Sequence, residues 1–449
     1  MTGVVLPFAA ITVMLLAALI LWKPVLPVML FGLLAPLGLT QMPGSVDLVT
    51  VLSALVIATA AWQYLLSASS LVPVSWAALG ACVWTVGTVA SVVFSSDPSR
   101  AAILGTWQIL AAWMAVGIAQ LVDTPQRIKA VCAAVLIGAT ITAASGLSGG
   151  LYVQGTYGAS VIQGRAVGVF SQPNEYGLYC AMVGAFSLGV ASVSRGYLRY
   201  LGALCSVAGI AGLATSFSRG AWFGAATAAL VMAILIPQTR RIQAVALTCV
   251  VTVLAAVSVI VPYWQLPGLL ASRILSVFTA EANPYDNRPA LVAEGLRQWA
   301  ERPILGVGPN MYPEESRTLL SQTRTLEGQH AHNLIITIGA EQGLIGVLAL
   351  TLFIVAVVSA TRTARRLITG IHSTTPSTIP MAAAVTLSSV GALVVILAAG
   401  LVDYPLRNAL TRSTAWLFVG LALAGQRCLD NTSRASSLQR GTDEHVITS

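Results

Sequence analysis

Residues 334–360 read LIITIGAEQGLIGVLALTLFIVAVVSA, and Glu341 is the only charged residue in this stretch. An α-helix needs about 20 apolar residues to cross the hydrocarbon core of a bilayer, so the stretch predicts a membrane span. Runs of the same kind fill most of the chain on both sides of it. The other candidate spans are 4–22, 25–42, 47–67, 72–94, 101–122, 128–148, 176–194, 198–217, 220–236, 242–263, 380–402 and 408–426.

The composition agrees with a membrane protein. Hydrophobic residues make up 56% of the chain and charged residues 9%, whereas about a quarter of an ordinary soluble domain is charged. The net charge of +8 comes almost entirely from arginine, because Lys23 and Lys129 are the only lysines. Basic residues kept on the cytoplasmic side of membrane helices explain this charge, so no nucleic acid is expected as a partner. The cysteines lie mostly in apolar runs and predict neither a disulfide nor a zinc cluster.

Short basic turns predict how the spans are oriented. They place the interval 264–332 outside and the C-terminus in the cytoplasm. The expected fold class is an all-α integral membrane protein with about 12 transmembrane helices and one large outer loop that carries short helices. Counts of 12 and 13 spans both remain open, and they put the N-terminus on opposite sides. The expected divisions are transmembrane helices with short loops over 1–263, the large loop over 264–332, C-terminal transmembrane helices over 333–426 and a polar cytoplasmic tail over 427–449.

The large loop contains one predicted helix, over 288–300. Pro289 suits a first helical turn, and Arg302-Pro303 ends the pattern. We expect a short amphipathic helix that lies over the outer mouth of the protein. Its apolar residues recur at helical spacing and are Leu291, Val292, Leu296 and Trp299.

Three features that the predicted topology places outside are suited to chemistry. Arg219 begins a span, Arg288 begins the loop helix, and His330-Ala-His332-Asn333 leads into the span 334–360. Arg165, in an outer loop, is a fourth candidate. Arginine stays charged and its planar fork binds phosphate oxygens in pairs. Histidine titrates near pH 7 and can take a proton from a hydroxyl group.

Each of these features also has a structural explanation. Arg219 could extend to the lipid headgroups, and Arg288 could form a surface ion pair with Asp286 or Glu294. His332 could cap its helix.

The pair formed by His330 and His332 could bind a metal, but no third ligand lies nearby in the sequence. Gly343 and Gly346, within the span that follows, are most simply sites of close helix packing.

Taken in order, the motifs resemble the O-antigen ligase/polymerase superfamily. The region that carries the resemblance covers about residues 160–350, with further predicted spans on both sides, and Gln172-Pro173-Asn174 also fits the pattern. The motifs are Arg219-Gly-Ala-Trp, then Arg288 with Trp299, Pro303 and Gly306-Val-Gly308, then His330-Ala-His332-Asn333, and finally Glu341-Gln-Gly343-Leu-Ile-Gly346.

The resemblance implies a GT-C-like, multi-pass glycosyltransferase of the bacterial inner membrane, with its site facing the periplasm. Such an enzyme moves a preassembled glycan from undecaprenyl diphosphate to an acceptor hydroxyl, and we expect inversion at the anomeric carbon. Matching positions make His332 the implied catalytic base, with Arg219 and Arg288 binding the diphosphate. No Asp-x-Asp or Glu-x-Asp pair occurs in the predicted outer segments, and Glu314-Glu315 lies well away from the histidine and arginine motifs, so we expect no metal and no cofactor. Secondary candidates are Arg165, His330 and Asn333.

Within the superfamily the O-antigen ligase, whose acceptor is lipid A–core, is the preferred member. The alternative is a polymerase of O-antigen or of another surface polysaccharide, which uses the same donor and a second lipid-linked repeat. Protein O-oligosaccharyltransferases are disfavoured because no additional soluble domain is predicted after Gln426. A transporter of lipid-linked glycans is disfavoured because most charges lie at span ends, Glu341 being the main exception. Membrane lipids are expected partners in every case.

Overall fold

A computed structural model of the chain describes residues 23–37, 47–66, 75–148, 165–244, 288–316, 330–371 and 380–447. Every long element in these ranges is a helix, and eight of the helices are long and apolar enough to cross a membrane. The expected all-α membrane class is therefore confirmed. The helices are α2 (Leu26–Leu34), α3 (Leu48–Leu66), α4 (Trp76–Val93), α5 (Pro98–Leu121), α6 (Pro125–Ser148), α7 (Pro173–Val193), α8 (Tyr197–Ser216), α9 (Arg219–Leu235), α12 (Arg288–Glu301), α14 (Leu334–Ile371), α15 (Met381–Ala399) and α16 (Ala409–Ile447).

The helices follow the predicted spans closely wherever the structure describes them. The predicted span 25–42 is represented by α2 and a short 3-10 turn, and the polar tail continues α16 as a helix. The predicted span 4–22 lies outside the described residues, and so does the predicted span 242–263 beyond Ala244. The choice between 12 and 13 spans and the side of the N-terminus therefore stay predictions.

Local signals in the sequence explain where several helices begin. The Asp97 side chain accepts a hydrogen bond from the backbone N–H of Arg100 at 3.1 Å ahead of α5. The Ser218 side chain likewise accepts a hydrogen bond from the backbone N–H of Ala221 at 3.4 Å. Helix α9 therefore begins with Arg219 as its first residue. Capping of this kind satisfies backbone donors that have no partner inside the helix. Arg219 is therefore fixed at a helix start by the serine before it.

Helix α15 forms the centre of the bundle, and nearly all of its side chains are buried. Helices α7, α9, α14 and α16 pack around it. Glycines bring the backbones close: a Cβ at Gly224 of α9 would lie 2.8 Å from the carbonyl oxygen of Val395. Small residues at such crossings are typical of membrane helices, which associate through close van der Waals contact.

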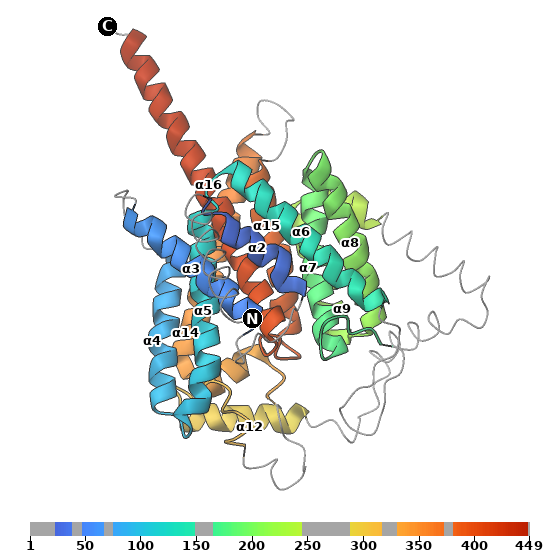
Figure 1. The fold of residues 1–449 in the computed structure, drawn as a ribbon, viewed down its shortest axis with the longest axis vertical. Helices are drawn as coiled ribbons and strands as arrows, with labels where there is room; N and C mark the ends of the chain where they lie inside the picture. The colour runs from blue at the N-terminus through green and yellow to red at the C-terminus, as the bar shows by residue number, and fades with distance from the viewer. Residues whose placement is uncertain are drawn as a thin grey trace, which may run out of the picture.

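Helix α12 confirms the loop helix predicted over 288–300. It lies across one end of the bundle, while the C-terminal part of α16 leaves at the opposite end (Figure 1). Gly339 of α14 lies so close to the ring of Trp299 that a Cβ there would overlap it. One turn earlier on the same face of α12, a Cβ at Gly295 would lie 3.1 Å from the Cβ of Ala331. The loop helix is thus packed directly onto the start of α14.

A break in α14 corrects the interpretation of Gly343 as a simple helix-packing site. Gly343 has φ 62° and ψ −159°, which is not helical. The chain at Pro303 and Ile304 lies against the break, where it accepts hydrogen bonds from the N–H groups of Leu344 (2.8 Å) and Ile345 (3.3 Å). A Cβ at Gly343 would overlap the carbonyl group of Ile304, so only glycine fits. The break joins the end of α12 firmly to α14.

Candidate active site

His332 is paired with an acid that lies far away in the sequence. Its Nδ1 atom is 2.9 Å from Oδ1 of Asp403, which lies in the loop between α15 and α16. Two further bonds hold the same loop to the start of α14. The backbone N–H of Leu334 donates to the carbonyl of Gly400 at 2.7 Å, and the Asn333 side chain donates to the carbonyl of Leu401 at 3.2 Å. The pair therefore lies where the start of α14 contacts the α15–α16 loop.

The charge on Asp403 determines which nitrogen of His332 carries hydrogen. Burial alone would raise the pKa of Asp403, but the hydrogen bond from His332, the charge of that ring and the Tyr404 backbone N–H outweigh it, so the pKa is lowered. Asp403 is therefore ionised at neutral pH, and a carboxylate can only accept hydrogen bonds. In neutral His332 the proton must then lie on Nδ1. This leaves the lone pair on Nε2, where a general base needs it.

The backbone of His332 is itself in an unusual conformation, with φ 48°. Residues other than glycine rarely adopt this left-handed region, and such strain costs about 1–3 kcal/mol unless the surroundings enforce it. Here the hydrogen bonds that Leu334 and Asn333 donate to the α15–α16 loop hold the His332 backbone in this conformation. This backbone conformation directs the imidazole toward Asp403, just before α14 begins.

A small polar cavity of about 70 Å³ lies beside the pair. His330, His332 and Asp403 line it together with residues from the start of α7 and from the α15–α16 loop. Glu175 lies in its wall, where its carboxylate accepts hydrogen bonds from Asn408 Nδ2 at 3.0 Å and from Ser171 Oγ at 3.1 Å. Carboxylate, amide and imidazole groups around one cavity suit a ligand rich in hydroxyl groups.

Arg219 lies close to this cluster through the packing of its helix. The next residue, Gly220, faces the α15–α16 loop, and a Cβ there would be 3.5 Å from a methyl group of Val402. On the other side, Gly177 of α7 approaches Ser216 and Ser218 so closely that a Cβ would clash. The exposed Arg219 thus begins a helix that is wedged between α7 and the loop that carries Asp403.

Arg288 is the exposed first residue of α12. Gly295, two turns further along the same helix, contacts Ala331, the residue before His332. At 1.5 Å per residue, Arg288 lies roughly 10 Å along the axis from that contact. The helix that carries Arg288 is therefore fixed alongside the His332 segment, with the arginine at its N-terminal end.

The three secondary candidates have structural partners. Arg165 is buried and donates from Nε to the carbonyl of Ser216 and from a terminal nitrogen to Asn174 Oδ1, both at 2.7 Å. Asn333 caps α14, because its Oδ1 accepts from the backbone N–H groups at 335 and 336. His330 is buried, with its ring centroid 5.2 Å from that of Tyr404 and 5.1 Å from that of His332. These side chains shape the site, and Arg165 joins the residues before α7 to the end of α8.

The histidine pair gains a third possible metal ligand in the folded chain. Ligand atoms of His330, His332 and Asp403 all lie within 4.8 Å of one another. The sequence argument against a metal relied on the lack of a third ligand nearby in the chain, and Asp403 removes that argument. A two-histidine, one-carboxylate set is one that zinc accepts. The expected metal independence accordingly stays a prediction, to be tested with a chelator.

Sequence reasoning missed two members of this cluster, Asp403 and Glu175. Asp403 lies in the turn between the predicted spans 380–402 and 408–426, which the predicted topology puts on the same side as His332. An acid in such a turn was therefore a signal that could have been used. Glu175 follows Gln172-Pro173-Asn174 at the start of α7, and only the folded structure reveals its bond to Asn408.

One family model matches part of the chain. Residues 204–351 match the family model described as O-antigen ligase. The matched segment contains most of α8, all of α9 and α12 and the first part of α14, and so includes Arg219, Arg288 and His332. It supports the predicted O-antigen ligase/polymerase superfamily, whose members are membrane glycosyltransferases. No curated protein matches the chain.

Proposed function

From the O-antigen ligase match of residues 204–351, we propose that the chain is an O-antigen ligase of the bacterial inner membrane. It transfers a preassembled polysaccharide from undecaprenyl diphosphate to a sugar hydroxyl of lipid A–core at the periplasmic face. The observation that carries the proposal is the pairing of His332 with Asp403 beside a polar cavity. This pair supplies an oriented base at the end of the bundle over which α12 lies.

The transfer proceeds as a single displacement. His332 Nε2 takes the proton of the acceptor hydroxyl while the hydroxyl oxygen forms a bond to the anomeric carbon of the glycan. The bond from that carbon to the diphosphate oxygen breaks, and its electron pair leaves with undecaprenyl diphosphate. Attack from the face opposite the leaving group inverts the anomeric centre. Asp403 holds the ring in place and stabilises the imidazolium that forms.

Arg219 and Arg288 balance the negative charge that develops on the diphosphate. An arginine fork can donate two parallel hydrogen bonds to phosphate oxygens and remains charged at every working pH. Two arginines can do the work for which other enzymes of phosphate esters use a divalent cation. The reaction is therefore proposed to be independent of metal, in spite of the ligand set at His330, His332 and Asp403.

The orientation of the site follows from charge. Basic turns at Arg195 and Arg199, at Arg240 and Arg241, and at the Arg362 cluster lie at the ends of helices remote from His332. Positive residues in short loops stay in the cytoplasm, so the end of the bundle covered by α12 faces the periplasm. The protein meets its glycan donor there after the donor has been moved across the membrane.

A strain that lacks the gene tests the proposal on a lipopolysaccharide gel. We expect loss of all attached O-polysaccharide, with long polymer still accumulating on undecaprenyl diphosphate. Wild-type protein should restore attachment and His332→Ala should not, whereas His330→Ala should restore it in part. Single repeats still attached to core, without longer chains, would show a polymerase and overturn the ligase assignment.

A further inference from the structure

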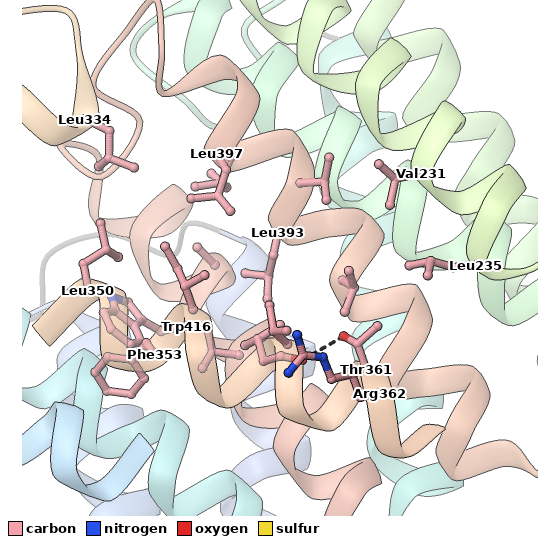
Figure 2. Close-up of a pocket in the computed structure, with 18 of the residues that line it drawn as sticks. Val231, Leu235, Leu334, Leu350, Phe353, Thr361, Arg362, Leu393, Leu397 and Trp416 are labelled. Atoms are coloured by element: carbon pink, nitrogen blue, oxygen red, sulfur yellow. Dashed lines mark hydrogen bonds between the residues drawn. The ribbon is translucent and has the colours of Figure 1, made fainter. Parts of the chain in front are cut away.

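An apolar cavity of about 390 Å³ lies between α9, α14, α15 and α16. Figure 2 shows its lining, which includes Leu350 and Phe353 of α14, Leu393 of α15 and Trp416 of α16. Val358 and Leu397 also line it and are 41% and 37% exposed, so the cavity opens sideways to the surroundings of the bundle. In a membrane, that opening faces lipid chains.

Two arginines stand at one end of this cavity. Arg362 and Arg365, one helical turn apart on α14, both line it, and no acidic side chain among the described residues does. Figure 2 shows the guanidinium of Arg362 among the apolar side chains. Over the part of the chain that the structure describes, Arg362 makes no ion pair and no side-chain hydrogen bond. Both arginines are exposed, so their guanidinium groups are accessible to the phosphate of a lipid whose chain enters the cavity.

The position of the arginines along α14 indicates the membrane leaflet that the cavity faces. Leu334 begins α14 next to the candidate active site, and Arg362 lies 19 residues beyond the break at Gly343, or roughly 28 Å of continuous helix at 1.5 Å per residue. This is close to the roughly 30 Å of the hydrocarbon core, so the arginines lie at the opposite membrane surface. From Arg362 back to Leu350 the helix covers about 18 Å, which is close to half of that core. An acyl chain of one leaflet therefore fits this part of the cavity, whose lining continues past Leu350 to Leu334.

We propose that this cavity binds an anionic glycerophospholipid of the cytoplasmic leaflet. One acyl chain lies along the face of α14 between Arg362 and Leu350, and the phosphate lies between Arg362 and Arg365. Basic pockets between membrane helices on the cytoplasmic side are suited to anionic headgroups, because guanidinium groups bind phosphate oxygens in pairs. The bound lipid links α14 to α9 and α15 at the end of the bundle remote from His332. This inference does not depend on the proposed transferase activity.

Native mass spectrometry of the full chain, purified in detergent, tests the proposal. The probes are phosphatidylglycerol and phosphatidylcholine with the same palmitoyl and oleoyl chains. We expect phosphatidylglycerol to stay bound at least tenfold more tightly than phosphatidylcholine. Replacing both arginines (R362Q with R365Q) should remove this preference, whereas Arg366→Gln, next to the site but outside the lining, should keep it.

A second variant leaves both arginines in place and fills the apolar part of the cavity. Val358→Trp projects from a partly exposed position, so the larger ring can be accommodated, and we expect it to weaken phosphatidylglycerol binding about tenfold. Equal retention of the two lipids would overturn the proposal, as would an equal effect of Arg366→Gln. Displacement of phosphatidylglycerol by an equimolar amount of undecaprenyl phosphate would also overturn it, since the cavity would then belong to the polyprenyl donor.

Discussion

Replacing Gly343 by alanine should destabilise the protein more than replacing another glycine of nearly the same backbone conformation. Gly343 has φ 62° and ψ −159°, and Gly196 has φ 64° and ψ −146°. Both alanine variants suffer the strain of that region, about 1–3 kcal/mol. They differ in their surroundings: nothing lies within 4 Å of a Cβ at Gly196, whereas a Cβ at Gly343 overlaps the backbone of Ile304.

The additional cost at Gly343 can be estimated from what must move. Shifting the chain at Ile304 lengthens the hydrogen bonds that Leu344 and Ile345 donate, each worth about 1 kcal/mol. Overpacking adds about 1–3 kcal/mol. Gly343→Ala should therefore lose at least about 3 kcal/mol more than Gly196→Ala.

Thermal unfolding in detergent, followed by tryptophan fluorescence, measures this difference. The Gly343 variant should melt clearly below the Gly196 variant, and the Gly196 variant moderately below wild type. Equal melting temperatures for the two variants would refute the reasoning, because they would show that the chain at 303–304 does not press on the break in α14.

Three further predictions concern the site. Arg288→Lys should lower transfer about tenfold, because an ammonium cannot replace the planar fork, while Arg302→Lys at the far end of α12 should leave the rate unchanged; steady-state assays with purified donor compare them. Incubation with a chelator should leave turnover intact, and inhibition that a divalent cation reverses would instead favour a metal at the histidine pair. The lowered pKa of Asp403 means that its bond to His332 stabilises the fold fully above its ordinary pKa of 3.8, and that this contribution is lost as pH falls through the lower folded value. The difference in melting temperature between wild type and Asp403→Asn should thus persist down to about pH 4 and shrink below it; a difference that is already lost at pH 5 would contradict the assignment.

The membrane helices were predictable because their signal is local. An apolar run of sufficient length has few alternatives to a span, and the stretch 334–360 is recovered within α14. The helix over 288–300 was also predictable, since Pro289 and the spacing of its apolar residues specify both its start and its buried face.

The details of the site were not predictable because they depend on contacts between distant segments. Asp403 meets His332 only because Leu334 and Asn333 bond to the α15–α16 loop. Similarly, Arg165 was a candidate site residue in a predicted outer loop, yet its guanidinium is buried and donates to the Ser216 carbonyl and the Asn174 side chain. Sequence spacing carries no information on such pairings until the packing of the helices is known.

The interpretation of Gly343 shows the same limit. Within an apolar span a glycine ordinarily marks close helix packing, whereas here it allows a conformation that no other residue adopts easily. The segment that presses on it, 303–308, belongs to the outer loop, and nothing in the sequence of α14 reveals its approach.

A double-mutant cycle on His332 and Asp403 tests the central claim most directly. The assay is transfer by purified protein from a lipid-linked donor to lipid A–core, with kcat measured for His332→Ala, Asp403→Asn and the double variant. Asparagine at position 403 would hold the imidazole in the wrong tautomer, so we expect a loss of about 10²-fold or more. Since Asp403 acts only through His332, the double variant should be no slower than His332→Ala alone. Losses that multiply would show that the two residues act independently and would contradict the account.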